Sequence, residues 1–306
     1  MIIVRGTFWM SMYAFFLAAA VVLGCGMFFA EAKRAGLELK AAPVFMAFTV
    51  VIIAAFGRLY LHLTKYTING MGFWGYTVFS LRPYEYAVCG AVLGLLLAGC
   101  LYSWFAKINA WCVLDALAVP ALFALAFARF GEHFSDFGWG QILLNAAWQR
   151  FPFAVADIYG QWHFAVYLLE GVLALAVGVW VLKHKSERPG QRFLRALLWW
   201  AATQIVCESL RAETIRWGFV RVQQLQCAVF MLAVLLINAQ RKGGLKRCGK
   251  SVMVFMLGVG MLVFVEYALD KLESIPVAVC YGLMVAALLL MGRTAEKQNG
   301  DFADEK

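Results

Sequence analysis

Residues 111–130, WCVLDALAVPALFALAFARF, form the stretch that decides the fold. Its two charged residues, Asp115 and Arg129, lie toward its two ends, and every residue between them is apolar. A bilayer core about 30 Å thick is spanned by about 20 apolar residues in an α-helix. The stretch therefore predicts a transmembrane helix that ends in an arginine.

Apolar stretches of this length recur along the chain. Hydrophobic residues make up 63% of the 306 residues and charged residues only 15%, whereas a soluble domain usually carries about 25% charged residues. We predict an all-α, polytopic integral membrane protein with about nine transmembrane helices and no separate soluble domain. The stretches cover, approximately, residues 8–30, 42–63, 84–106, 109–130, 163–182, 194–212, 219–239, 252–269 and 276–292.

The basic residues are distributed unevenly between the two sets of loops. One set holds 17 of the 27 Lys and Arg residues, including the clusters KHKSERPGQRFLR at 183–195 and RKGGLKRCGK at 241–250. Short loops rich in Lys and Arg remain in the cytoplasm. We therefore predict an external N-terminus, a cytoplasmic C-terminus and an external loop at 131–162. That loop is rich in Trp and Phe, and we expect it to fold against the membrane interface.

The composition argues against several other classes of protein. A net charge of +9 could suit nucleic acid, but membrane topology accounts for the positions of the basic residues, so we expect no nucleic-acid partner. The eight cysteines contain no C-x-x-C pair and are interpreted as small apolar helix residues. VVLGC, ending at Cys25, and LAGC, ending at Cys100, look like lipobox cleavage sites, but apolar chain continues past each.

Three arginines are predicted to reach the same depth near the outer leaflet. Arg58 lies near the outer end of the second stretch, Arg129 closes the fourth, and Arg211 closes the sixth. Gln204, Glu208 and Arg211 follow i, i+4, i+7 spacing, so they share one helix face. An arginine remains charged and offers a planar fork of donors that suits phosphate. A pocket lined by these arginines could hold the headgroup of an anionic phospholipid.

A structural interpretation of the same residues stays open. Each arginine could extend to the interface or neutralise a neighbour such as Glu208. Glu170 and Glu266 lie inside apolar stretches, where a carboxylate needs a partner. The remaining polar candidates are weaker, since they stand at the ends of stretches: His62, His163, Asp115, Gln223, Gln224 and Gln226.

Taken together, these stretches resemble the bacterial prolipoprotein diacylglyceryl transferases over about residues 9–240. RFGEHFSDFGWG, beginning at Arg129, resembles the family pattern GRxGNFxNxExxG. The stretch from Arg188 to Arg211, RPGQRFLRALLWWAATQIVCESLR, resembles PGxxFxxxLxxYGxxRFxxExxR. Shorter segments resemble further family motifs: WMSMYAFFLAA at 9–19, FGRLYLHL at 56–63, CGAVLG at 89–94, YLLEGVLAL at 167–175 and RVQQLQ at 221–226.

The resemblance implies an enzyme of the bacterial cytoplasmic membrane. Such a transferase moves a diacylglyceryl group from phosphatidylglycerol to the lipobox cysteine of a preprolipoprotein, forming a thioether and releasing glycerol phosphate. The partners would be an anionic phospholipid and a preprolipoprotein signal peptide, and no metal or other cofactor is implied. The resemblance also divides the chain into a seven-helix domain at 1–240, two additional helices at 241–292 and a polar tail at 293–306, which we expect to be disordered.

Several family motif positions carry other residues here. The family's histidine is Cys89, its first asparagine is Glu132, its second asparagine is Ser135, its glutamate is Phe137, and its arginine in YGxxR is Gln204.

A thiol nucleophile needs a base or a lowered pKa, and a leaving phosphate needs positive charge. We hypothesise that Arg129 and Arg211 bind the lipid phosphate, with Arg58 at the same depth and Glu208 orienting an arginine. His133, Glu132 or Asp136 could serve as the base.

Two other functions remain in view. A non-catalytic or repurposed relative that binds lipid would also need the arginines, and the replaced motif residues favour it. A transporter would place polar residues through the middle of the bilayer, whereas the charges here gather toward one leaflet.

Overall fold

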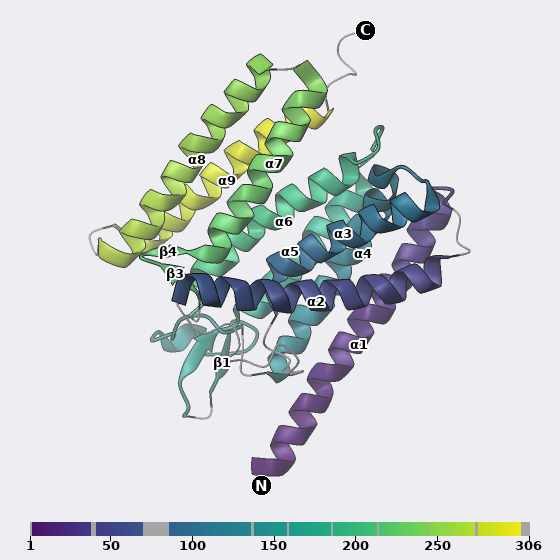
Figure 1. Ribbon diagram of the computed structural model, residues 1–306. Coiled ribbons are helices and arrows are strands. Elements are labelled where there is room, and N and C mark those ends of the chain that lie inside the picture. Colours follow the sequence, from purple (N-terminus) through teal and green to yellow (C-terminus); the bar gives the residue numbers. More distant parts are fainter. Residues whose placement is uncertain are drawn as a thin grey trace. The chain divides into compact units, whose positions relative to one another are not determined.

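The computed structural model describes residues 2–37, 41–69, 86–135, 138–157, 159–184, 186–212, 214–243, 245–272 and 275–300. The described residues form nine α-helices and two short antiparallel hairpins (Figure 1). The α-helices are α1 (Ile2–Arg34), α2 (Ala42–Asn69), α3 (Val88–Ala106), α4 (Ala110–Gly131), α5 (Val166–Lys183), α6 (Gln191–Leu210), α7 (Val222–Gly243), α8 (Leu245–Lys271) and α9 (Val277–Gly300). Each overlaps one predicted stretch, and the all-α, membrane-spanning class is confirmed.

Eight of the nine described helices are long and apolar enough to cross a membrane by length and composition. The exception is α6, which carries Arg192, Arg195 and Glu208 and is less apolar than the other helices. Much of α6 is nevertheless buried, including Arg195 and Glu208. A helix whose charged groups are buried must satisfy them within the protein, which distinguishes α6 from the helices that present apolar faces.

The described chain contains some β structure that the prediction lacked. Strands β1 (Ala154–Ala156) and β2 (Trp162–Phe164) form one hairpin, and β3 (Arg216–Trp217) and β4 (Val220–Arg221) form another. The second strand of each hairpin, β2 or β4, occupies the start of a helix expected from residue 163 or 219, because backbone pairing across the turn holds these residues in extended conformation. At the C-terminal end α9 continues to Gly300, into the segment where we expected disorder.

The chain folds into two compact units, Met1–Phe193 and Leu194–Lys306. In the first, α1 packs along α4, α2 along α3, and α4 along α5; in the second, α7, α8 and α9 pack against one another. The predicted division into a seven-helix domain at 1–240 and two added helices rests on the family resemblance and not on these two units. It stays a prediction.

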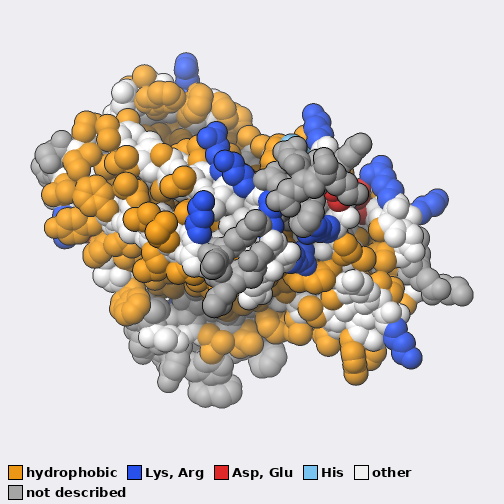
Figure 2. Space-filling view, turned by 90° about the horizontal axis from the view of Figure 1, so that it is seen from above, with side chains coloured by type: hydrophobic (Ala, Val, Ile, Leu, Met, Phe, Trp, Pro, Cys, Tyr) orange, Lys and Arg blue, Asp and Glu red, His pale blue; other side chains and the backbone are white. Residues whose placement is uncertain are grey.

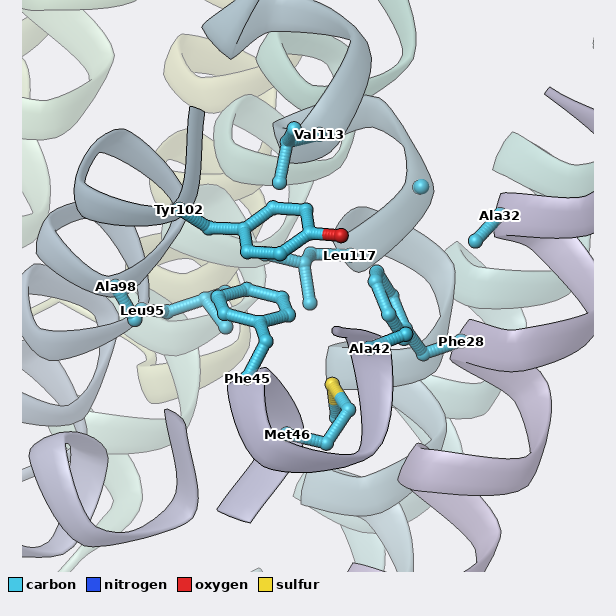
Figure 3. Packing of buried hydrophobic residues seen from close by; sticks show 11 residues of the cluster. Phe28, Ala32, Ala42, Phe45, Met46, Leu95, Ala98, Tyr102, Val113 and Leu117 are labelled. Carbon is cyan, nitrogen blue, oxygen red and sulfur yellow. The ribbon is translucent and has the colours of Figure 1, made fainter. Parts of the chain in front are cut away.

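The core of the first unit lies where four helices meet (Figure 3). Phe45 from α2 stacks on Tyr102 from α3, with ring centroids 4.1 Å apart, and Phe28 from α1 packs against Phe45. Leu117 of α4 completes the cluster. This core contains the last turns of α1 and the first turns of α2 and α4.

Glycines let α2 and α3 approach closely. A Cβ atom on Gly90 would lie 2.6 Å from the carbonyl oxygen of Phe56, and one on Gly94 would lie 3.0 Å from the carbonyl oxygen of Ile52. Small residues four positions apart allow this contact between membrane helices. The backbone N–H of Ala87, just before α3, also donates to the Gly57 carbonyl at 2.9 Å. Arg58 therefore comes directly after the residues of α2, Phe56 and Gly57, that contact α3 most closely.

Candidate functional site

Arg58 and Arg129 both belong to the first unit, and both side chains are buried. Each lies 12 residues beyond a core residue of its own helix, Met46 in α2 and Leu117 in α4, which corresponds to about 18 Å at the helical rise of 1.5 Å per residue. Helix α2 continues to Asn69, so Arg58 lies well inside the helix and not near its end as predicted. The common depth of the two arginines stays a prediction.

Arg129 sits in the last turn of α4, where the helix changes form. The α-helix ends at Gly131 and continues as the 3-10 helix η1 (Glu132–Phe134). Gly131 lies against α1, since a Cβ atom there would be 2.6 Å from Cβ of Phe16. Phe16 also stacks on Phe134 with ring centroids 5.6 Å apart. These contacts hold the turn that carries the candidate residues.

Two carboxylates hold the Arg129 guanidinium. Its Nη1 pairs with Oε1 of Glu132, and its Nε lies 2.6 Å from Oε1 of Glu170 on α5. All three side chains are largely shielded, with exposed fractions of 8%, 15% and 4% for Arg129, Glu132 and Glu170. A buried charge requires such compensation. Glu170 therefore finds the partner that its position inside an apolar stretch requires.

The candidate base His133 is held by a tyrosine of α5. Its Nδ1 lies 2.7 Å from the hydroxyl oxygen of Tyr167, which is completely buried. If the hydroxyl donates to Nδ1, the imidazole carries its proton on Nε2; if Nδ1–H donates, Nε2 is free to accept a proton. The ring of Phe151 from the external loop also contacts the His133 ring, with centroids 5.7 Å apart.

Gly138, in the loop after α4, lies directly against the side chain of Glu132. Gly138 has φ +79°, in the left-handed region, and a Cβ atom on it would collide with Oε2 of Glu132 and lie 3.3 Å from Cβ of Tyr167. Only glycine suits both this backbone conformation and this space. The same residue therefore shapes the surroundings of Glu132 and Tyr167.

Two tyrosines connect Arg58 with this cluster. The guanidinium carbon of Arg58 lies 5.9 Å from the ring centroid of Tyr86, within range of a cation–π contact. Tyr13 of α1 lies within electrostatic range of Tyr86, Arg129 and Glu132. The first unit thus contains both arginines, with Arg58 beside Tyr86 and Arg129 beside Glu132 in the turn that also carries His133.

The second unit holds the other predicted residues. Helix α6 ends at Leu210, so Arg211 follows the helix instead of lying on its face as predicted. Nε of Arg211 lies 3.8 Å from Oε2 of Glu208, and the Arg211 backbone N–H donates to the Glu208 carbonyl at 3.2 Å. Glu208 is thus placed to neutralise Arg211, and its hypothesised orienting role stays a prediction. Gln204 is buried one turn earlier.

A second buried arginine stands beside this pair. Nη1 of Arg221 donates to the carbonyl oxygen of Arg211 at 2.7 Å, and its Nε lies 3.5 Å from Oε2 of Glu266 on α8. Nε2 of Gln224 donates to Oε1 of Glu266 at 2.7 Å. Arg221, Gln224 and Glu266 are all buried. Glu266 is thus paired inside the second unit.

Other candidates have structural partners. Asp115 accepts hydrogen bonds of 2.7 Å from the backbone N–H groups of Gly190 and Phe193 and so caps the start of α6. Cys89, at the family's histidine position, is buried in α3. Asp136 lies outside the described residues.

His163 lies in β2 and faces Asp157, with 3.4 Å between its Nε2 and Oδ2 of Asp157. Burial raises the pKa of Asp157, but hydrogen bonds outweigh it. The backbone N–H groups of Gln161 and Tyr159 and the ring of His163 together hold the pKa below its usual value. His163 and Asp157 thus stabilise the external hairpin.

Sequence reasoning missed two of these residues. Tyr167 stands three positions before Glu170, on the same helix face, and that i, i+3 spacing is a usable signal. Arg221 stands two positions before Gln223, but its burial gave no sequence signal. The charge of Glu266 inside an apolar stretch signalled that a partner existed without identifying it.

Comparisons with known proteins identify the family of this chain. The family model for prolipoprotein diacylglyceryl transferase matches residues 1–240. Three similar proteins carry the name phosphatidylglycerol–prolipoprotein diacylglyceryl transferase. That of Limosilactobacillus reuteri is 23% identical over 254 residues, covering 78% of this chain and 89% of the relative.

The protein of Listeria innocua is 22% identical over 247 residues, covering 77% and 87%. That of Lactococcus lactis subsp. cremoris is 25% identical over 245 residues, covering 75% and 89%. Because the family model matches well over half of its residues, this chain belongs to the prolipoprotein diacylglyceryl transferase family.

Proposed function

We propose that this protein transfers a diacylglyceryl group from phosphatidylglycerol to the lipobox cysteine of a prolipoprotein. The observation that carries the proposal is the polar cluster at the end of α4, where buried Arg129 stands beside the His133–Tyr167 pair. It combines positive charge for a phosphate with a group able to accept a proton. Membership of the transferase family supports the same reaction.

The reaction exchanges one bond to carbon for another. The thiol of the lipobox cysteine loses its proton to a base, and the sulfur attacks the sn-3 carbon of the lipid's glycerol. The carbon–sulfur bond forms as the carbon–oxygen bond to the phosphate breaks. Glycerol phosphate leaves with that electron pair, and the product is a thioether.

The arginines supply the positive charge that stabilises the departing phosphate. Arg129 uses Nη1 and Nε for its two carboxylates, and a guanidinium has further N–H groups that can reach a phosphate oxygen. Arg58 adds a second positive charge to the first unit. We assign the same phosphate-binding role to Arg211 in the second unit, with Glu208 orienting it.

His133 is the base that we favour over Glu132 and Asp136. Glu132 is engaged with Arg129, whereas the imidazole of His133 can take up a proton on Nε2 in the tautomer in which Nδ1–H donates to the Tyr167 hydroxyl. A neutral imidazole at pH 7 is suited to take a proton from a thiol.

The proposed topology has nine membrane helices, an external N-terminus and a cytoplasmic C-terminus in the bacterial cytoplasmic membrane. Figure 2 shows Lys and Arg side chains in blue among the apolar surface residues, and basic residues are expected to gather on the cytoplasmic side of a membrane protein. The loop at 131–162 exposes large apolar side chains, among them Leu144 and Tyr159, with exposed fractions of 90% and 84%. Such side chains suit a loop lying at the membrane interface.

Complementation tests the proposed activity. Bacterial cells depleted of their own transferase would express the wild type, Arg129→Ala or Arg150→Ala, and prolipoprotein modification would be followed. Arg150→Ala is the control, because it removes an exposed charge from the loop that follows α4. Wild type and Arg150→Ala should both restore modification. Arg129→Ala should lower the rate at least about 100-fold, the usual cost of losing one group that stabilises developing charge.

Two outcomes would count against the proposal. If Arg129→Ala restored modification as well as wild type, the phosphate assignment would be wrong. If wild type at normal membrane levels restored nothing, the transferase activity would be wrong. The alternative, a relative that binds lipid without transferring it, is favoured by Glu132, because this carboxylate neutralises Arg129 where the family has an asparagine. Binding of phosphatidylglycerol by an inactive wild type would support that alternative.

A further inference from the structure

Helix α8 follows the part of the chain that the family model matches, yet it carries a buried carboxylate. The match ends at residue 240, and α8 begins at Leu245. Glu266 lies in its apolar part with only 5% of its surface exposed. A carboxylate at such a position is costly unless it is paired. Its partners show what the helix contributes.

Glu266 contacts two side chains of the family-matched part of the chain, Arg221 and Gln224. Oε2 lies 3.5 Å from Nε of Arg221, and Oε1 accepts a hydrogen bond of 2.7 Å from Nε2 of Gln224. Gln224 also donates to the carbonyl of Ile205 in α6 at 3.1 Å. Glu266 therefore uses one oxygen for each of two buried side chains.

Arg221 transmits this contact to the end of α6. Its Nη1 donates to the carbonyl oxygen of Arg211 at 2.7 Å and to Oγ1 of Thr214 at 3.1 Å. On the other side of the residue, the Arg211 N–H donates to the Glu208 carbonyl. The backbone of Arg211 is thus held at both its N–H and its C=O, which limits where its side chain can point.

We propose that Glu266 is a positioning residue, supplied by a helix outside the family-matched region, that holds Arg221 and through it the phosphate-binding Arg211. This inference rests on the proposed function, because it gives Arg211 the task of binding lipid phosphate. Glu266 also neutralises Arg221, so that Arg221 braces the backbone instead of competing for the phosphate. The pairing leaves Arg211 with Glu208 as its own counter-ion.

Helix α9 braces α6 at two further points. The hydroxyl of Tyr281 lies 3.4 Å from both Oγ and the carbonyl oxygen of Ser209, next to Glu208. Farther along, Glu296 pairs with Arg195 and accepts from Trp199 Nε1, each at 3.2 Å. Helix α9 therefore supports α6 near both of its ends, which makes the C-terminal helices more than an added membrane anchor.

The test compares purified full-length variants in phosphatidylglycerol vesicles with a lipobox peptide. Glu266→Gln retains the size of the side chain but removes its charge, so we expect kcat/KM for phosphatidylglycerol to fall about 10-fold, with KM for the peptide unchanged. Asp270→Asn removes another, partly exposed carboxylate of α8 and should match wild type. The double variant Glu266→Gln/Arg221→Gln should lose no more than the worse single variant, since both act through one contact.

Hydrogen exchange gives a readout that does not depend on activity. Glu266→Gln should speed exchange of the Arg211 and Val222 amides, whereas Asp270→Asn should not. If wild type catalyses no transfer, the proposed function fails, while faster exchange still shows that Glu266 holds the Arg211 backbone. Unchanged exchange would overturn the positioning role. Faster exchange with unchanged kcat/KM in an active enzyme would reduce Glu266 to a structural contact and also overturn the proposal.

Discussion

At the scale of single residues, pairing decides what each charged group can do. Arg129 is held by Glu132 and Glu170, and His133 is held by Tyr167. In a medium of low polarity these contacts are strong and an unpaired group is expensive. The candidate site is therefore a set of paired groups in which each side chain has a fixed neighbour.

Tyr167→Phe tests the pairing of His133. Loss of the hydroxyl frees Nδ1, so the imidazole is less well oriented, and we expect kcat to fall about 10-fold with KM for phosphatidylglycerol little changed. Tyr159→Phe, which alters a tyrosine that is 84% exposed, is the matched control. Equal kcat in the two variants would remove Tyr167 from the mechanism.

Gly138→Ala tests the space beside Glu132. Gly138 and Gly160 have nearly the same backbone angle, φ +79° and +78°, but a Cβ atom at Gly160 meets nothing within 4 Å. We expect both alanine variants to lose about 1 kcal/mol of stability from backbone strain. Only Gly138→Ala should also lose transferase activity, because its methyl group displaces Glu132. Steady-state kinetics beside thermal unfolding separates the two effects, and equal activity would contradict the prediction.

At the scale of elements, close helix contacts set where the arginines lie. Gly90 lets α3 approach α2 next to Arg58. Gly90→Ala should lower the melting temperature in detergent, because adding a methyl group to a well-packed contact costs about 1–3 kcal/mol of stability. The same variant should weaken binding of phosphatidylglycerol. Gly26→Ala in α1, where a Cβ atom meets nothing within 4 Å, should leave both unchanged. A Gly90→Ala protein that matched Gly26→Ala would show that α2 and α3 adapt easily.

The hairpin of β1 and β2 should loosen in acid. The folded pKa of Asp157 is below its unfolded value, so its stabilising contribution is present above the unfolded pKa of about 3.9. It is lost as the pH falls through the folded pKa. Exchange of the Tyr159 and Gln161 amides, which donate to Asp157, should speed up over that window in wild type. Asp157→Asn should remove this pH dependence, and an unchanged profile in the variant would contradict the assignment.

At the scale of the whole molecule, the proposed orientation makes a labelling prediction. In a cysteine-free background, Tyr159→Cys should react with a membrane-impermeant maleimide on intact cells, because its loop is predicted to be external. Lys183→Cys, at the end of α5, should react only after the cells are opened. The reverse pattern would invert the topology, and both outcomes are read by gel shift.

The positions of the helices and the membrane class could be predicted from the sequence because both depend on local composition. An apolar run long enough to cross a bilayer can be recognised from its own residues, without reference to any other part of the chain. The turns were harder: the helix at α4 gives way to a 3-10 turn after Gly131, and β2 and β4 replace residues expected to be helical. Pairing between separate segments overrode local propensity there.

The sequence by itself determined that Arg129 and Arg211 stand at helix ends, and that Glu170 and Glu266 need partners in an apolar setting. Only the tertiary structure decided which partners they have: Arg129 for Glu170, and Arg221 with Gln224 for Glu266. The physical reason is that the cost of burying a charge is a property of the residue and its surroundings in the chain. The group that compensates this charge is chosen by the packing of helices far apart in the sequence.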